Sequence, residues 1–265
     1  AELIGSEQIR GVSLTGSTGV GERVGALAGR HLKKCVLELG GSDPFIVLED
    51  TDLDFTVRGA VAGRMLANGQ SCIASKRFML VRAIAEAFTA RFAAGMAALT
   101  VGDPLDEATT LGPMARADLR DELHEQVTRS VEAGARCLLG GEIQEGPGAF
   151  YPATVLSNVR AGMPAYAEEL FGPVAAILPV DSEQEALRVA NDSEFGLGAA
   201  VFTRDLARGE EIAARHLEAG SCFVNAFVRS DPRLPFGGIK ASGYGRELGS
   251  FGIHEFVNIK TVYIG

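Results

Sequence analysis

Short apolar runs alternate with amphipathic stretches along nearly the whole chain, and this alternation constrains the fold more than any other feature. Leu53, Val57, Val61 and Met65 recur at the spacing of one helical turn, which predicts a helix over Asp52–Leu66. Regular exchange between such helices and short buried strands is typical of α/β proteins with largely parallel sheets. We expect strands at Ile9–Thr15, Val36–Leu39, Phe45–Leu48, Phe78–Val81, Cys137–Leu139, Val174–Val180, Ala199–Thr203 and Cys222–Val224. Further helices are expected at Val20–Lys33, between Ile84 and Met96, between Leu119 and Val131, at Glu183–Asn191 and at Leu206–Leu217.

Two segments depart from this alternation. Glu142–Ala149 is rich in glycine and contains a proline, so we expect an exposed loop there. Phe256–Ile264 is apolar at several positions and predicts a last strand. A strand with nothing after it must pair with another strand or fray.

Composition excludes several classes of protein. The chain has 265 residues, 46% of them hydrophobic and 22% charged, and a net charge of −9, which is ordinary for a globular protein. No block of Lys or Arg could follow a phosphate backbone, so we expect no nucleic acid partner. The chain has no apolar run of about 18 residues, so we expect no membrane-spanning helix. The histidines are scattered and the four cysteines contain no C-x-x-C pair, so we expect a reducing cytoplasmic environment and no metal.

Cys72 is the first candidate for chemistry. It ends the phrase Gly69-Gln-Ser-Cys72, shortly after a predicted helix, so it is expected on a turn with exposed backbone amides. Such amides can lower the pKa of a thiol and stabilise an oxyanion. The alternative is a buried structural cysteine, and the phrase alone does not separate the two.

Glu38 is the second candidate, because a carboxylate within the apolar strand Cys35–Leu39 is unfavourable unless it faces a polar site. Burial there would raise its pKa toward neutrality, which suits a general base. A solvent-facing residue of an alternating strand is the other interpretation.

Two loops could contact a ligand. The glycines of Leu14–Gly21 lie between a predicted strand and helix, where backbone amides can bind phosphate. The phrase Glu168-Glu-Leu-Phe-Gly-Pro173 places two acids beside an aromatic at a turn, although an ordinary loop could have the same composition.

Taken in order, these phrases resemble the aldehyde dehydrogenase superfamily over the whole chain. The series comprises Leu14–Gly21, Glu38-Leu-Gly-Gly41, Gly69-Gln-Ser-Cys72, Glu168–Pro173, Pro235-Phe-Gly-Gly238 and Ser242–Glu247. Within the family, Glu38–Pro44 and Ser230-Asp-Pro-Arg233 are similar to bacterial NAD(P)-dependent succinate-semialdehyde dehydrogenases. The resemblance implies an α/β fold with the remnant of a Rossmann-type cofactor domain and an α/β catalytic domain.

The resemblance also implies roles for individual residues. Cys72 would attack the aldehyde to give a thiohemiacetal, hydride transfer to NAD or NADP would leave a thioester, and Glu38 would activate the water that hydrolyses it. The cofactor would be bound by Gly16, Ser17, Leu39, Glu169 and Phe171. Ser230 and Arg233 are candidates for binding the substrate, which we expect to be succinate semialdehyde or a similar short aldehyde.

The sequence departs from the family pattern in several places. Leu66 stands where many succinate-semialdehyde enzymes have an arginine for the substrate carboxylate, and Ala74 stands where some members have a second cysteine. The N-terminal part of the family, with an asparagine oxyanion donor and the residues that select NAD or NADP, is expected to be absent.

The resemblance divides the chain into four parts. We expect the C-terminal part of the NAD(P)-binding domain at 1–39, the catalytic domain at 40–228, a segment returning to the cofactor domain at 229–250, and an oligomerisation strand at 251–265. A homodimer or homotetramer is expected. Two alternatives are a coenzyme A-acylating aldehyde dehydrogenase and a catalytically inactive fragment that only self-associates. Glu38 argues against the first, because acyl transfer to coenzyme A needs no water-activating base.

Overall fold

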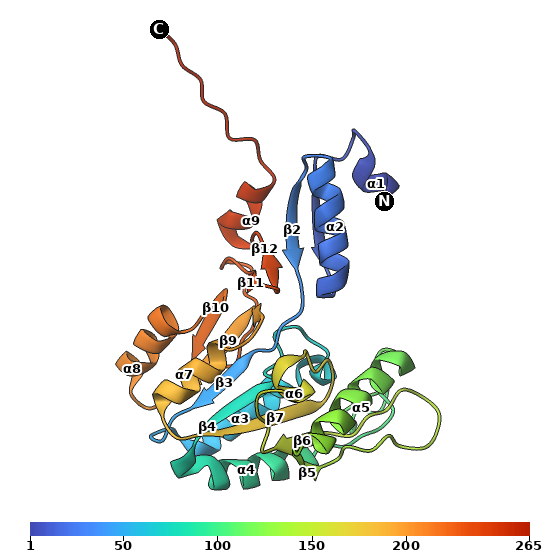
Figure 1. Cartoon of the computed structure of the whole chain (residues 1–265), viewed down its shortest axis with the longest axis vertical. Coiled ribbons are helices and arrows are strands. Elements are labelled where there is room, and N and C mark those ends of the chain that lie inside the picture. The colour runs from blue at the N-terminus through green and yellow to red at the C-terminus, as the bar shows by residue number, and fades with distance from the viewer.

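The computed structural model describes residues 1–265. It contains two main β-sheets, and most of the helices pack against the larger one (Figure 1). The larger sheet has seven strands in the order β10-β9-β3-β4-β7-β6-β5, and only the β5–β6 pair is antiparallel. The strands are β3 (Pro44–Val47), β4 (Arg77–Val81), β5 (Arg136–Leu139), β6 (Thr154–Ser157), β7 (Val174–Val180), β9 (Gly198–Phe202) and β10 (Ser221–Val224). The predicted α/β class with largely parallel pairing is therefore confirmed.

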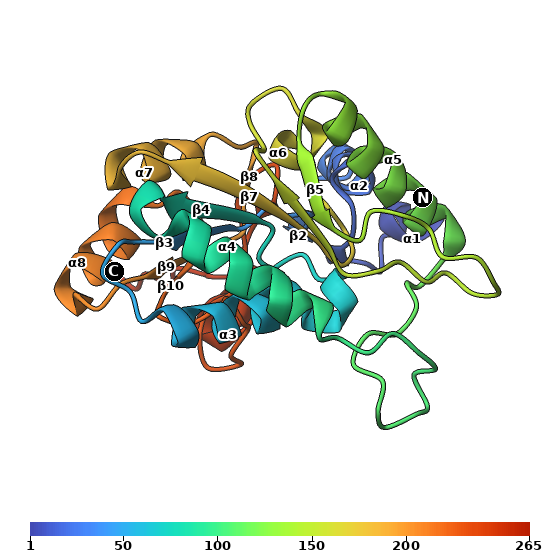
Figure 2. The same ribbon diagram turned by 90° about the horizontal axis from the view of Figure 1, so that it is seen from below.

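Helices cover both faces of this sheet, as Figure 2 shows from below. Phe45, Phe78 and Phe202 point to the face that packs against α3 (Leu53–Arg64) and α4 (Arg82–Ala97). Their neighbours Ile46, Met79 and Val201 belong to the core on the other face. Because successive strand side chains point to opposite faces, fully buried strands are apolar at every position. The second face packs against α5 (Ala117–Glu132), α6 (Pro164–Ala167), α7 (Glu183–Asn191), α8 (Leu206–Glu211) and the π-helical turn Ile212–His216.

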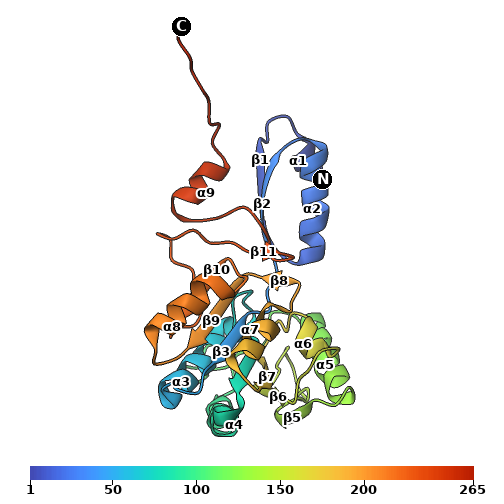
Figure 3. The same cartoon turned by 60° about the vertical axis from the view of Figure 1, so that its left-hand side comes forward.

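The smaller main sheet belongs to a unit that stands apart from the larger sheet (Figure 3). Its three strands, β1 (Gly11–Thr15), β2 (Lys34–Glu38) and β12 (Gly243–Tyr244), are ordered β1-β2-β12. The helices α1 (Glu2–Gly5) and α2 (Thr18–Arg30) belong to this unit, and β2 leads directly into the larger sheet. The return segment at 229–250 therefore contributes a strand beside β2. A two-stranded pair, β8 (Phe195–Gly196) and β11 (Ile239–Lys240), lies between the two main sheets.

The C-terminal segment differs from the prediction. Helix α9 (Gly249–Glu255) precedes an extended tail that projects from the molecule and pairs with no strand (Figure 1). The predicted strand Phe256–Ile264 is therefore not formed within this chain, because the tail leads away from both main sheets after Phe256 (Figure 1). No helix of the structure is both long and apolar enough to cross a membrane.

Candidate active site

A cleft of about 660 Å³ lies where the smaller unit meets the loops above the larger sheet. Its lining draws on both units, from Thr15 and Leu39 on one side to Phe195 on the other. Six of the residues singled out from the sequence line this one cleft: Gly16, Ser17, Leu39, Cys72, Glu169 and Phe171. Residues that lie up to 155 positions apart in the sequence thus share one ligand-sized cavity, although their individual roles stay predictions.

Cys72 is carried by a tightly reversed loop that follows α3. Ala67 and Asn68 have φ angles of 50° and 57°, and Gly69 follows with a φ of 75°. A Cβ atom on Gly69 would lie 2.2 Å from the carbonyl oxygen of Gly172, so only glycine fits this contact. The reversal leaves Cys72 half-buried in the lining of the cleft.

The environment of the Cys72 thiol contains opposing influences. Burial is the largest and raises its pKa, while the nearby Lys76 cation lowers it. The carboxylates of Asp43 and Glu169 raise it further, and a hydrogen bond from the backbone amide of Ile73 lowers it. The net effect is an upward shift, so the resting thiol is protonated near neutral pH and needs help to become a nucleophile.

Lys76 lies beneath the Cys72 loop and is completely buried. Its Nζ donates hydrogen bonds to the carbonyl oxygens of Ser71 at 3.2 Å, Cys72 at 2.9 Å and Ala74 at 3.1 Å. Burial lowers the pKa of Lys76 to about 8, against the opposing effect of Glu169. One cation therefore holds three carbonyl groups of the loop.

Glu169 is fixed by the turn that follows β2. Its Oε1 accepts a hydrogen bond from the amide of Gly41 at 3.0 Å and lies 3.9 Å from Lys76 Nζ. A Cβ atom on Gly40 would lie 2.5 Å from Glu169 Oε2, so the glycine permits this close approach. The carboxylate thus reaches the cleft beside Phe171 while remaining tied to the main chain.

Glu38 lies at the end of β2 with only 3% of its surface exposed. Neither carboxylate oxygen has a hydrogen-bond partner. Burial and the charge of Glu247 raise its pKa to about 8, against the opposing charge of Arg246. Gly243 is its partner in the β2–β12 register, and a Cβ atom on Gly237 would lie 2.7 Å from Glu38 Oε1. Glu38 is not among the residues that line the cleft, so this conformation keeps it behind the return segment.

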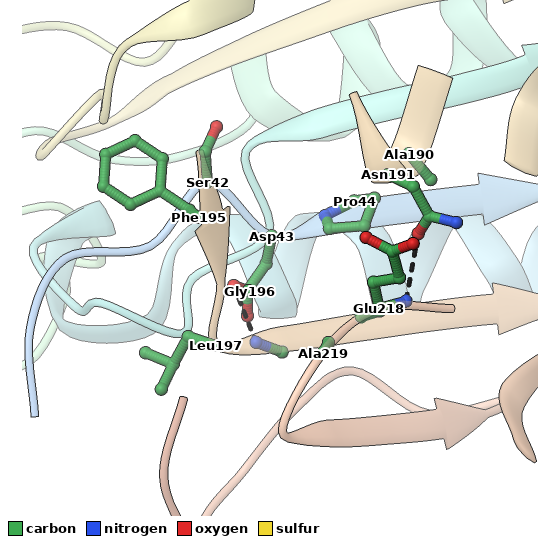
Figure 4. Close-up of a pocket in the computed structure, with 12 residues that line it drawn as sticks. Ser42, Asp43, Pro44, Ala190, Asn191, Phe195, Gly196, Leu197, Glu218 and Ala219 are labelled. Atoms are coloured by element: carbon green, nitrogen blue, oxygen red, sulfur yellow. Dashed lines mark hydrogen bonds between the residues drawn. The ribbon is translucent and has the colours of Figure 1, made fainter. Parts of the chain in front are cut away.

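A set of buried polar residues, which the sequence analysis did not single out, lies around the Cys72 loop. Asp43 Oδ1 accepts a hydrogen bond from the Gly198 amide at 3.0 Å, while its Oδ2 has no partner. Figure 4 shows Asp43 at a second cavity, whose volume of about 10 Å³ is that of one water molecule. Arg64 Nη2 donates to the Gly69 carbonyl at 2.6 Å. One feature of the sequence could have indicated this set. Lys76 and Arg77 directly precede the apolar strand Phe78–Val81, so at least one of the two basic side chains is expected to be buried.

The predicted substrate residues lie elsewhere. Ser230 is exposed, and the Arg233 side chain is 84% exposed and paired with Asp231. Arg233 donates to both carboxylate oxygens of Asp231, at 2.9 and 2.6 Å, which lowers the pKa of that acid. The structure does not bring Ser230 or Arg233 into the lining of the cleft, and their role in substrate binding stays a prediction.

The chain is similar to known proteins along almost its whole length. The model of the aldehyde dehydrogenase family matches residues 1–262. The chain is 56% identical over 263 residues to the succinate semialdehyde dehydrogenase [NAD(P)+] Sad of Escherichia coli, covering 99% of this chain and 57% of that relative. It is 48% identical to a probable succinate-semialdehyde dehydrogenase [NADP(+)] of Synechocystis, covering 100% of this chain and 58% of the relative.

A solved structure has a similar fold. The succinic semialdehyde dehydrogenase of Streptococcus pyogenes, in complex with NADP+, superposes with a TM-score of 0.96 at 39% identity. The alignment covers 99% of this chain and 58% of that one. The chain therefore spans a little more than half the length of the relatives it matches.

Proposed function

Because the chain belongs to the aldehyde dehydrogenase family, we propose that the protein containing it oxidises an aldehyde to the carboxylic acid with NAD or NADP. The observation that carries this proposal is the shared cleft, in which Cys72, Glu169 and the Gly16–Ser17 turn face one ligand-sized space. Succinate semialdehyde is the first candidate substrate, since similar chains carry that name.

The cleft fits a dinucleotide on its nicotinamide side. Ser17 precedes α2, a helix of 13 residues, and its side chain makes no capping bond, so the helix N-terminus is available to a phosphate. Glu169 would accept hydrogen bonds from ribose hydroxyls, with Phe171 beside the ring and Leu39 on the opposite wall. A cofactor bound in this way supplies the hydride acceptor.

Cys72 begins the reaction. Its thiolate forms a bond to the aldehyde carbon while the carbonyl oxygen becomes an oxyanion, which the Cys72 amide, free of hydrogen bonds within the protein, would stabilise. A bound nicotinamide would accept hydride from that carbon, and this oxidation would leave a thioester on Cys72. The raised pKa of the thiol means that a proton must first leave it.

Glu38 completes the reaction. After rotation toward the cleft, its carboxylate takes a proton from water as the hydroxyl adds to the thioester carbon, and the Cys72 sulfur leaves with the acid released. A pKa of about 8 suits a base that works near neutral pH. This role disfavours the coenzyme A-acylating alternative, for which no water-activating carboxylate is required.

The surroundings of Cys72 bear on the substrate. Leu66 packs with Ile73, Leu197 and Val228 in a small apolar cluster beside the cysteine. An ω-carboxy aldehyde would need a cation beyond this cluster. We therefore propose that a cation, either Arg233 or a residue outside this chain, binds the substrate carboxylate. Assembly into a homodimer or homotetramer and a cytoplasmic location are also proposed.

The function is tested by replacing the nucleophile in the full-length protein. Cys72→Ala should abolish NAD(P)-dependent oxidation of succinate semialdehyde while circular dichroism and thermal melting stay unchanged, because a small half-buried thiol contributes little stability. Cys222→Ala, which removes another half-buried thiol, is the matched control and should retain full turnover. Turnover above trace level in Cys72→Ala would refute the assignment of Cys72 as the nucleophile, whereas no turnover in the wild-type protein would favour the inactive, self-associating alternative.

A further inference from the structure

The contacts of Lys76 fall on particular peptide units of the Cys72 loop. A carbonyl oxygen belongs to the same peptide unit as the amide of the following residue. By binding the carbonyl oxygens of Ser71 and Cys72, Lys76 therefore holds the peptide units that carry the amides of Cys72 and Ile73.

Those two amides belong to the nucleophile itself and to the residue that follows it. The Ile73 amide is the backbone group that lowers the pKa of the Cys72 thiol. The Cys72 amide donates no hydrogen bond within the protein, which leaves it free for an oxyanion. A charge-assisted bond at one end of a peptide unit polarises the unit and strengthens the bond made at its other end.

We propose that Lys76 is a positioning residue that orients and polarises the peptide units Ser71–Cys72 and Cys72–Ile73, so that their amides stabilise the Cys72 thiolate and the oxyanion formed on its substrate. This proposal rests on the proposed role of Cys72 as the nucleophile. Lys76 itself does not touch substrate, because it is completely buried beneath the loop.

The charges around Lys76 support this role. Glu169 and Asp43 favour its protonated form, while the buried Arg64 cation disfavours it. The groups that face Cys72 are Lys76, Asp43 and Glu169, of which only Lys76 is a cation. Removing Lys76 would therefore leave the thiolate opposed by two carboxylates and by burial.

Arg64 provides a matched comparison. It is also a completely buried cation and also donates to a carbonyl oxygen of this loop, that of Gly69 at 2.6 Å. The amide of that peptide unit belongs to Gln70, which donates to the Ala67 carbonyl at 3.0 Å and not to the nucleophile. Arg64 thus stabilises the loop without acting on the amides that serve Cys72.

The experiment measures the rate of Cys72 alkylation by iodoacetamide as a function of pH, followed by mass spectrometry of the peptide that contains it. In Lys76→Met the profile should move by about one pH unit to higher pH, a tenfold loss of thiolate at a given pH. Lys76→Arg should recover part of the shift, and Arg64→Met should leave the profile in place. An unchanged profile in Lys76→Met, or an equal shift in Arg64→Met, would overturn the proposal.

Folding and turnover are followed in the same variants. Circular dichroism checks the fold, and if Lys76→Met does not fold, the double variant Lys76→Met with Glu169→Gln removes one uncompensated carboxylate and is compared with Glu169→Gln alone. In the full-length protein, Lys76→Met should lower kcat with little change in KM. If the role of Lys76 were merely structural, the pH profile of Cys72 alkylation in Lys76→Met would be like that of wild type. Alkylation needs neither cofactor nor aldehyde, so its result is independent of whether Cys72→Ala loses turnover.

Discussion

The amide of Gly41 donates a hydrogen bond to Glu169 Oε1 at 3.0 Å, joining residues 128 positions apart. The same glycine approaches the nucleophile loop, since a Cβ atom on Gly41 would lie 2.5 Å from the Cys72 carbonyl oxygen. One short turn after Glu38 therefore touches both the cleft carboxylate and the loop that carries the thiol. Glu169 and the Cys72 loop are therefore linked through Gly41, whose position leaves no room for a side chain.

Gly41→Ala should accordingly damage the site as well as the fold. The new methyl group must displace the Cys72 carbonyl, which Lys76 holds, and overpacking of this kind costs about 1–3 kcal/mol. We expect a lower melting temperature and a kcat reduced by more than the loss of folded protein explains. The control is Gly29→Ala in α2, where no atom lies within 4 Å of the new Cβ and a gain of up to about 1 kcal/mol is expected. Equal effects of the two substitutions on kcat would contradict the linkage.

Glu38→Gln should separate the two halves of the reaction in the full-length protein. An amide cannot accept the proton of water at neutral pH, so the thioester should form but hydrolyse slowly. Rapid-mixing absorbance of the reduced nicotinamide should show one burst per active site followed by a steady rate at least about 100-fold lower. Loss of the burst together with the steady rate would place Glu38 before hydride transfer.

The same substitution should change how stability depends on pH. The pKa of Glu38 is about 8 in the folded protein, above the ordinary value of 4.5, so the native state binds the proton more tightly than the unfolded state. The stabilisation of the native state by protonated Glu38 is fully present below about pH 4.5. It is lost as pH rises through about 8, by at most about 1.4 kcal/mol per pH unit. Relative to wild type, the Glu38→Gln variant should therefore gain stability between pH 5 and pH 9. Thermal melting of both proteins across that range measures the difference, and parallel curves would exclude a buried neutral Glu38.

Long periodic segments of the fold could be predicted because their burial is written into successive residues. Val174–Val180 and Glu183–Asn191 coincide with β7 and α7. The short strand Thr154–Ser157 was missed, because its polar ends hide its burial between two neighbouring strands. β12 has two residues and exists only because β2 offers it an edge.

The site shows the same limit. Cys72 and Glu38 could be singled out because a thiol on a glycine-bounded turn and an acid in an apolar strand are locally unusual. Lys76 and Asp43 were missed because their importance depends on contacts with backbone groups, which periodicity does not specify. Asp43 accepts from Gly198, 155 residues away, and no local pattern announces that bond.

The extended tail after α9 exposes an apolar segment. Ile259, Val262 and Ile264 are 84%, 74% and 89% exposed, and their backbone pairs with nothing in the chain. An extended apolar segment with free amides and carbonyls can add to a sheet edge of a second copy. Ile259→Lys places a charge in that segment and should shift the chain from dimer or larger assembly toward monomer in light scattering. Leu105→Lys, at a residue that is 92% exposed in a loop, is the control and should leave the mass unchanged. A wild-type chain that is monomeric at the same concentration would remove the role we give to residues 256–264.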